Sequence, residues 1–206
     1  GWGLSIEGNH HFDSTLQMET GIPGDFAGAR AACRPMICGL RGGGSVQWAG
    51  VVDGIRVEQT YSVLNEGLFI LMEVTLRNTT DATHVVTYFR NVDPDNMVTL
   101  TSVYETTNTI VSQGDGSATS LAHVSATTTA PDSYLALISQ DPDARVSIGG
   151  FLNRRADDVW DCVGFVCAEE ATAYDDNAIS LAVRKTIAPG AYVTFRLAYT
   201  LDAVSV

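Results

Sequence analysis

The sequence has few charged residues, a single lysine and no long apolar run. Charged residues make up 17% of the 206 positions, and Lys185 is the only lysine. No apolar stretch approaches the roughly 20 residues that a membrane-spanning helix needs. Acidic residues outnumber basic ones by 24 to 12, which gives a net charge of −12. That charge repels nucleic acid and anionic membrane surfaces and attracts divalent cations, although acidity can also serve solubility alone. We therefore predict neither a nucleic-acid partner nor a membrane span.

The sequence also lacks the common motifs of nucleophilic catalysis. No Gly-x-Ser-x-Gly segment is present, and the cysteines come in pairs, which argues against a thiol nucleophile. His10 and His11 are adjacent, so in a strand they would point to opposite faces and would rarely chelate one metal together. We predict that the chain is not an enzyme. Glycoside hydrolysis by paired carboxylates is the enzymatic alternative that stays open.

The four cysteines form two pairs with the same spacing. Cys33 and Cys38 make one pair, and Cys162 and Cys167 make the other. Two local disulfides are the simplest solution, and a zinc site with four thiolates is the alternative. Disulfides imply an oxidising compartment, so we expect a secreted or cell-surface protein. The first residue is Gly1 rather than Met, which is typical of a mature chain after signal-peptide removal.

The chain shows the alternation of apolar and polar residues that is typical of β-strands. Between residues 55 and 63, apolar side chains occupy every second position. Strands are predicted at 55–63, 68–77, 83–92, 98–104, 109–112, 121–127, 134–139, 145–148, 179–184 and 192–201, with short helical turns at 154–161 and 166–173. Many short strands joined by Gly, Asn, Asp and Pro predict an all-β antiparallel β-sandwich of the jelly-roll or immunoglobulin kind.

We expect one domain over residues 1–206, because no linker or internal repeat is present. Residues 51–206 would form the sandwich core. Residues 1–50 would be irregular, with a long glycine-rich loop at 21–44. A strand near either end of the chain could pair with the open edge of a neighbouring subunit, which predicts a homo-oligomer or polymer.

A group of oxygen-bearing side chains follows the predicted strand at 83–92. Asp93, Asp95 and Asn96 lie within four positions around Pro94, and calcium prefers several oxygens from such a turn. Further candidate ligands stand on other turns: Glu105, Asn108, Asp141, Asp143, Asp175 and Asp176. The alternative is a set of solvated turns, since Asp-Pro-Asp is ordinary turn chemistry. Arg90 precedes the first group, so we expect it to pair with one of those carboxylates and support the site.

Several segments resemble the calcium-dependent β-sandwich domains of bacterial RTX adhesins. They are Tyr-Phe-Arg-Asn-Val-Asp-Pro-Asp at 88–95, Thr-Thr-Asn at 106–108, Asp-Asn-Ala-Ile-Ser-Leu at 176–181 and Ile-Ala-Pro-Gly at 187–190. The resemblance covers roughly residues 55–202. It implies that Asp93, Asp95 and Asn108 hold calcium, that Asp175 and Asp176 contribute, and that a calcium ion helps to grip a peptide or a sugar.

Three functions follow from these expectations. The first is a non-enzymatic structural subunit of an extracellular filament, sheath or surface layer, stabilised by disulfides and calcium. The second is an adhesin domain that binds a peptide or glycan through calcium. The third is an extracellular glycoside hydrolase.

Overall fold

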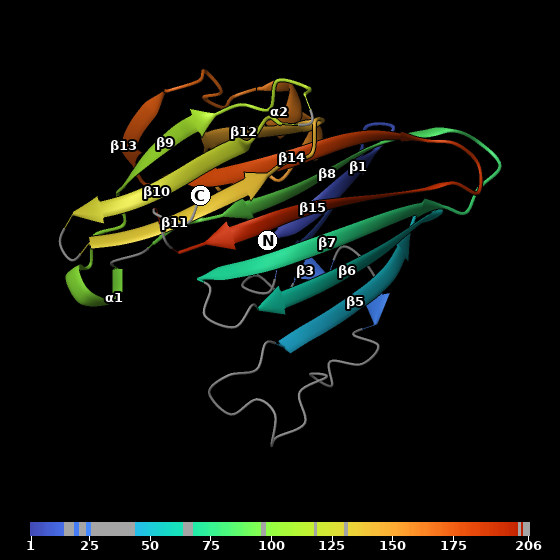
Figure 1. The fold of residues 1–206 in the computed structure, drawn as a ribbon, viewed down its shortest axis with the longest axis horizontal. Helices are drawn as coiled ribbons and strands as arrows, with labels where there is room; N and C mark the ends of the chain where they lie inside the picture. Colours follow the sequence, from blue (N-terminus) through green and yellow to red (C-terminus); the bar gives the residue numbers. More distant parts are fainter. Residues whose placement is uncertain are drawn as a thin grey trace.

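Two antiparallel sheets form the body of the molecule and confirm the predicted all-β sandwich (Figure 1). The computed structural model describes residues 1–14, 19–20, 24–25, 44–63, 68–95, 98–117, 119–129, 132–201 and 203. Among these residues no helix is long and apolar enough to span a membrane.

The smaller sheet has six strands in the order β12-β14-β8-β1-β2-β3. In that order they cover Ala144–Gly149, Ala178–Ile187, His84–Val92, Trp2–Ile6, Asn9–Ser14 and Glu19–Thr20. Its central strands β8 and β14 are long and mostly buried. The strands that lie beside them come from distant parts of the chain, so this sheet depends on non-local pairing.

The larger sheet has nine strands in the order β13-β9-β10-β11-β15-β7-β6-β5-β4. In that order they cover Thr172–Asp175, Thr106–Ser112, Ala122–Thr129, Asp132–Ser139, Tyr192–Thr200, Phe69–Asn78, Ile55–Val63, Gly44–Val52 and Gly24–Asp25. Strand β6 shows why these segments are strands. Ile55, Val57 and Gln59 face inward and are buried, whereas Arg56 and Glu58 face outward and are exposed.

The hydrophobic core lies between the two sheets. Trp2 of β1 meets Trp48 of β5 edge to face, with ring centroids 4.8 Å apart, and Tyr88 of β8 meets Phe195 of β15 at 5.4 Å. Each pair joins the smaller sheet to the larger one, and such aromatic contacts add stability beyond the burial of area. The inward residues of both sheets therefore form one continuous core.

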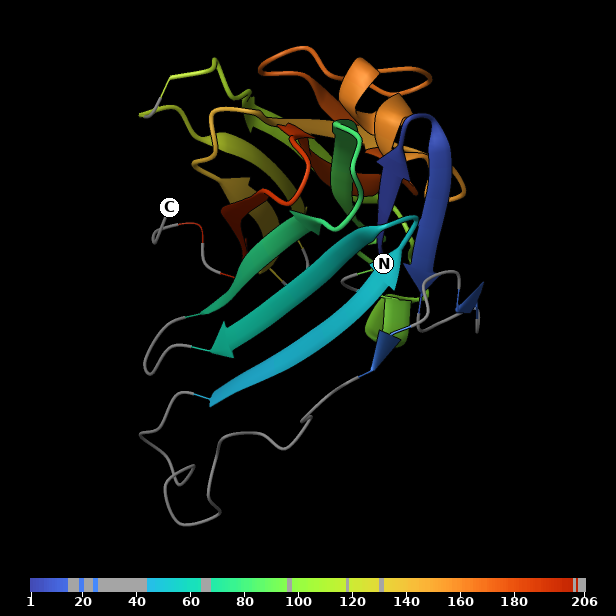
Figure 2. The ribbon, with the colours of Figure 1, turned by 90° about the vertical axis from the view of Figure 1, so that its right-hand side faces the viewer.

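A short helix covers the outer face of the smaller sheet (Figure 2). Helix α2, Ala156–Asp161, places Ala156 and Val159 against Phe89 of β8 and Ala182 of β14. This second apolar cluster explains why β8 and β14 carry buried residues on both faces. The helical turn predicted at 154–161 corresponds to α2.

The first fifty residues are more regular than predicted. Strand β1 is fully buried and pairs with β8 on one side and β2 on the other, and β5 pairs with β6 along its whole length. Of the two strands proposed for exchange, the one near the N-terminus is thus paired on both sides within its own chain, and the one at 203–206 lies outside the described residues apart from residue 203. The glycine-rich loop predicted at 21–44 lies outside the described residues, apart from β4 and the first residue of β5.

Two local predictions are wrong. A strand was expected at 98–104, but helix α1 covers Val98–Thr101 and ends before Ser102, whose positive φ of 57° cannot continue a helix. A helical turn was expected at 166–173. There, Val166 exchanges two backbone hydrogen bonds with Ile148, and the chain continues into β13.

Candidate functional site

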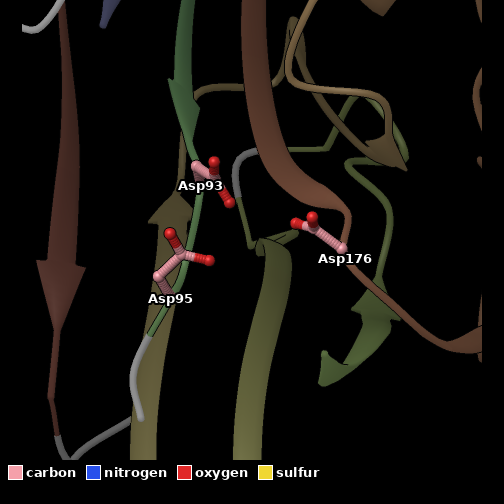
Figure 3. Close-up of side chains that lie close together, drawn as sticks. All are labelled: Asp93, Asp95 and Asp176. Atoms are coloured by element: carbon pink, nitrogen blue, oxygen red, sulfur yellow. The ribbon is translucent and has the colours of Figure 1, made fainter. Parts of the chain in front are cut away.

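Three carboxylates meet at one end of the sandwich. Asp93 and Asp95 follow β8, and Asp176 lies in the turn between β13 and β14. One oxygen of each carboxylate lies within 4.8 Å of the others. Figure 3 shows the three side chains directed toward a common space. We call Asp93, Asp95 and Asp176 the acidic cluster.

The pairing of β8 with β14 brings the acidic cluster together. Val92 is paired with Ile179 in an antiparallel register, and continuing this register beyond that pair places Asp95 opposite Asp176. Strand β13 belongs to the larger sheet and β14 to the smaller one. Asp176 therefore stands where the chain crosses between the sheets, and the acidic cluster joins this crossover to the end of β8.

Partial burial and repulsion between neighbouring carboxylates raise the pKa of two of these groups, Asp93 and Asp95. Burial is the largest cause that raises the pKa of Asp93 to about 6, and the negative charges of Asp95 and Asp176 add to it. Burial and the charge of Asp176 also raise the pKa of Asp95. Burial and repulsion thus both act against the ionisation of Asp93 and Asp95.

Among the described residues, no positive charge compensates the acidic cluster. Within the described part of the chain, no basic side chain forms an ion pair with any of its carboxylates. The Oδ1 atom of Asp95 is buried and has no hydrogen-bond partner in the part of the chain that the structure describes. A divalent cation would neutralise the repulsion and supply that partner. Calcium takes 6–8 oxygen ligands, so these residues would provide part of its shell.

Asn108 lies behind the acidic cluster and supports it. Its side chain is fully buried, with Nδ2 3.5 Å from the backbone oxygen of Asn177 and Oδ1 accepting a hydrogen bond from Thr106 at 3.0 Å. Asn108 thus steadies the turn that carries Asp176. The other predicted neighbours divide into two groups: Glu105 and Asp175 do not join the three carboxylates, and Asn96 lies outside the described residues.

Asp141 and Asp143 have a different role. Both carboxylates accept hydrogen bonds from Lys185, at 2.7 and 2.8 Å. The positive charge of Lys185 already compensates them, so the geometry ties the turn before β12 to β14. The single lysine of the chain thus has a structural partner at a position where a calcium ligand was expected.

The structure confirms one of the predicted disulfides. Cys162 and Cys167 are bonded and close a short loop after α2. This bond excludes the four-thiolate zinc site, which needs both of these sulfurs as thiolates. Cys33 and Cys38 lie outside the described residues.

Arg90 does not support the acidic cluster as expected. Its side chain points into the core, where the guanidinium donates to Gln59 and Tyr61 and lies 5.1 Å from the centre of the Tyr61 ring. Arg90 is 5% exposed. The alternation of side chains along β8 explains why the prediction for Arg90 was wrong. Arg90 and Tyr88 both face inward, whereas the turn after Val92, which carries the acidic cluster, leaves the sheet.

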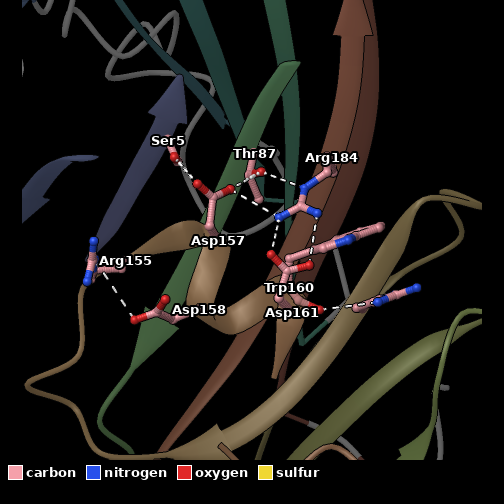
Figure 4. Close-up of polar contacts among 9 residues, drawn as sticks. Ser5, Thr87, Arg155, Asp157, Asp158, Trp160, Asp161 and Arg184 are labelled. Atoms are coloured by element: carbon pink, nitrogen blue, oxygen red, sulfur yellow. Dashed lines mark hydrogen bonds and ion pairs between the residues drawn. The ribbon is translucent and has the colours of Figure 1, made fainter. Parts of the chain in front are cut away.

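Sequence reasoning missed the polar network that holds α2 in place (Figure 4). Asp157 accepts hydrogen bonds from Ser5, from Thr87 at 2.6 Å and from Arg184 at 3.1 Å. Arg184 also forms an ion pair with Asp161. These residues lie on four separate elements, so only the position of Asp157 in the predicted helical turn could have drawn attention to it.

Comparisons with known proteins find similar structures but no similar sequence family. No family model matches the chain, and no curated protein matches it. A solved structure titled as a polysaccharide lyase is 11% identical with a TM-score of 0.44, over 75% of this chain and 21% of that one. A putative kojibiose phosphorylase from human microbiome is 10% identical with a TM-score of 0.42, over 98% of this chain and 21% of that one. An alpha-galactosidase from Lactobacillus brevis is 8% identical with a TM-score of 0.35, over 98% and 26% respectively.

These comparisons correct the prediction that the chain is not an enzyme. The structures reported above are named as a lyase, a phosphorylase and a galactosidase, and this chain spans about a quarter or less of their length. None of them is named as an adhesin or as a filament subunit. TM-scores below 0.5 carry no argument about which activity this chain has, so the proposals below rest on its own residues.

Proposed function

We propose that the acidic cluster binds a divalent cation, with Ca²⁺ the expected ion, and that this ion fastens the end of β8 to the crossover between the sheets. One observation carries the proposal. Three carboxylates from two distant segments converge within 4.8 Å, with no basic side chain of the described residues to compensate them. Hard cations prefer such oxygen ligands.

The disulfide supports an extracellular setting for this site. Cys162 and Cys167 are bonded, and disulfides persist mainly in oxidising compartments. Extracellular calcium modules can work with weak affinities, in the range of about 10⁻⁴ to 10⁻³ M. A site with three carboxylates and remaining positions for water fits that range.

Calorimetric titration of Ca²⁺ into the EDTA-treated chain, together with thermal unfolding, tests this proposal. We expect saturable binding and a rise in the melting temperature, because an ion that binds only the folded state stabilises it. Asp95→Asn and Asp176→Asn should each abolish both effects. Asp175→Asn is the matched control, since it removes the same charge from the adjacent position outside the acidic cluster. A wild-type melting temperature that does not respond to Ca²⁺ would overturn the proposal.

Acid catalysis of glycoside hydrolysis is the second candidate for the same residues. A pKa of about 6 would keep Asp93 partly protonated near neutral pH, as a general acid requires. One oxygen of each carboxylate lies within 4.8 Å of the others, so a second carboxylate is near enough to act as nucleophile, as in retaining glycosidases, whose two carboxyl groups lie roughly 5 Å apart. Asp95 or Asp176 would take that role.

The metal dependence separates the two candidates. A hydrolase would cleave nitrophenyl glycosides or polysaccharides in EDTA, would lose activity in Asp93→Asn, and would be inhibited by a cation that ionises Asp93. A cation site would instead show Ca²⁺ binding that EDTA removes, and the chain would not cleave these substrates. Turnover that persists in Asp93→Asn would exclude Asp93 as the general acid.

A further inference from the structure

The outer face of the larger sheet carries two rows of mostly polar side chains that cross four strands. In the first row, Gln47 of β5 is paired with Thr60 of β6, Thr60 with Glu73 of β7, and Glu73 with Arg196 of β15. The second row runs beside it and contains Ala49, Glu58, Thr75 and Thr194. Side chains that are paired across strands in this way share one face of a sheet.

The side chains of these rows on β5, β6 and β7 line a hollow of about 350 Å³, which we call the outer groove, whereas Thr194 and Arg196 of β15 lie beyond its lining. Its walls include Gln47, Arg56, Glu58, Thr60, Glu73 and Thr75, and the buried residues Trp48 and Gln59 also line it. The volume lies within the range of roughly 300–1,000 Å³ that is typical of small-molecule sites. The acidic cluster contributes no residue to it.

Internal hydrogen bonds hold the polar groups of the outer groove in place. Arg56 donates to Glu58 at 2.7 Å, and Arg196 donates to Glu73 at 2.8 Å. The hydroxyls of Thr75 and Thr194 lie 2.8 Å apart. These groups therefore have defined positions, and each keeps further hydrogen-bonding capacity toward the solvent side.

The charges of the outer groove cancel. Arg56 and Glu58 form one ion pair within the outer groove, and Glu73 of the groove is paired with Arg196, which lies just outside it, in a chain whose net charge is −12. An anionic ligand would meet carboxylates and a cationic ligand would meet guanidinium groups. A neutral ligand with many hydroxyls avoids both conflicts, because each hydroxyl can donate to Glu58 or Glu73 and accept from an arginine.

An apolar hollow continues the outer groove along β7. It has a volume of about 330 Å³ and is lined by Phe69, Leu71, Leu121, Ile138 and Ala198, with Arg196 at its border. Leu71 and Glu73 are successive outward residues of β7, so the two hollows adjoin at the Glu73–Arg196 pair. Sugars present both hydroxyl edges and apolar C–H faces. The hydroxyl edges match the polar outer groove, and the C–H faces match the apolar hollow.

From these features we infer that the outer groove binds a neutral oligosaccharide. One sugar would lie in the outer groove, and the next sugar along would place its C–H face against the apolar hollow. This site is separate from the acidic cluster and does not need a cation. Glu73 and Arg196 are the residues on which binding depends most, because they stand where the two hollows meet.

The test is an array of neutral and anionic oligosaccharides probed with the whole chain in EDTA, with each bound glycan then titrated by calorimetry. The main variant is Glu73→Ala together with Arg196→Ala, which leaves the net charge unchanged. Arg77→Ala is the matched control, because it removes an exposed side chain from the same strand and face but outside the outer groove. Circular dichroism and thermal unfolding confirm that each variant is folded.

We expect binding to neutral glycans in EDTA, at least a tenfold loss in the double variant and no loss in Arg77→Ala. Three results would overturn the proposal: no neutral glycan bound by the folded chain, binding of anionic glycans alone, or a double variant that binds as tightly as the wild type. Binding that requires Ca²⁺ would point to the acidic cluster and would also overturn it. A failure of the calcium proposal alone would leave this result unchanged.

Discussion

The guanidinium of Arg90 lies 2.6 Å from the side-chain oxygen of Gln59, in the interior between the two sheets. Arg90 comes from β8 and Gln59 from β6, so the contact joins the smaller sheet to the larger one. Tyr61 and Tyr88 donate to the same oxygen, at 2.7 and 3.1 Å. A neutral amide thus takes the place that a carboxylate usually has beside a buried positive charge.

This arrangement predicts a strong dependence on Gln59. Gln59→Leu removes the shared acceptor and leaves Arg90 and two tyrosine hydroxyls without it, so the free energy of unfolding should fall by about 3 kcal/mol. Adding Arg90→Met removes the uncompensated charge and should restore at least about 1 kcal/mol. Urea unfolding of both variants measures these changes. A double variant no more stable than Gln59→Leu would contradict this account of the charge.

The raised pKa of Asp93 predicts that the stability of the protein depends on pH in an unusual way in cation-free buffer. Its pKa is raised from 3.8 to about 6, so between these values the folded protein holds a proton that the unfolded chain releases. Stability from this group therefore falls as the pH rises through that window. Asp93→Asn should raise the melting temperature at pH 7.5 by about 2–4 °C, the shift that 1 kcal/mol produces at this size. Near pH 4 the difference should vanish, and a variant that is less stable than the wild type at pH 7.5 would disprove the repulsion.

Asp157 should be the main polar anchor of α2. Burial alone would raise its pKa, but hydrogen bonds from Ser5 and Thr87 and the charge of Arg184 outweigh burial and lower the pKa. The stability that Asp157 contributes is thus present above pH 3.8 and is lost as the pH falls through its folded pKa. Asp157→Asn should cost about 2 kcal/mol at pH 7.

Asp161→Asn is the control for this prediction, because Asp161 pairs with the same arginine. Its carboxylate is 49% exposed, so its loss should cost less than about 1 kcal/mol. Urea unfolding at pH 7 measures both variants. Equal losses in the two variants would show that the ion pair alone, and not the network around Asp157, fixes the helix.

The Cys162–Cys167 disulfide should make a moderate contribution to stability. For so short a loop, Cys162→Ser with Cys167→Ser should lower the free energy of unfolding by about 2 kcal/mol. The loop also carries Val166, which pairs with Ile148 at the edge of the smaller sheet. Hydrogen exchange at the Val166 amide should therefore speed up in the variant. Unchanged exchange at this amide would show that Val166 pairs with Ile148 without help from the disulfide.

Local sequence patterns were sufficient to find most of the strands. The alternation at 55–63 predicted β6 with its bounds, since the pleat of a strand sends successive side chains to opposite faces whatever the partner strand is. The same reasoning expected a strand near β1 only as a segment for exchange with a neighbour, and it missed β5, because β1 is buried on both faces and β5 shows little alternation. It also expected a strand where α1 forms. That prediction failed because Val and Thr favour strands only where a neighbouring strand is present to pair with them.

The sequence by itself determined the strand-rich architecture, the acidic turn after β8 and the closely spaced cysteines at 162 and 167, because each depends on neighbours within a few residues. Only the tertiary structure decided which of the candidate acids meet. The pairing of β8 with β14 joined Asp95 to Asp176, whereas Asp141 and Asp143 received Lys185 as their partner. It also gave Arg90 an interior partner in Gln59. Strand register and the face on which a side chain lies are set by contacts between segments far apart in the chain, and no local pattern records them.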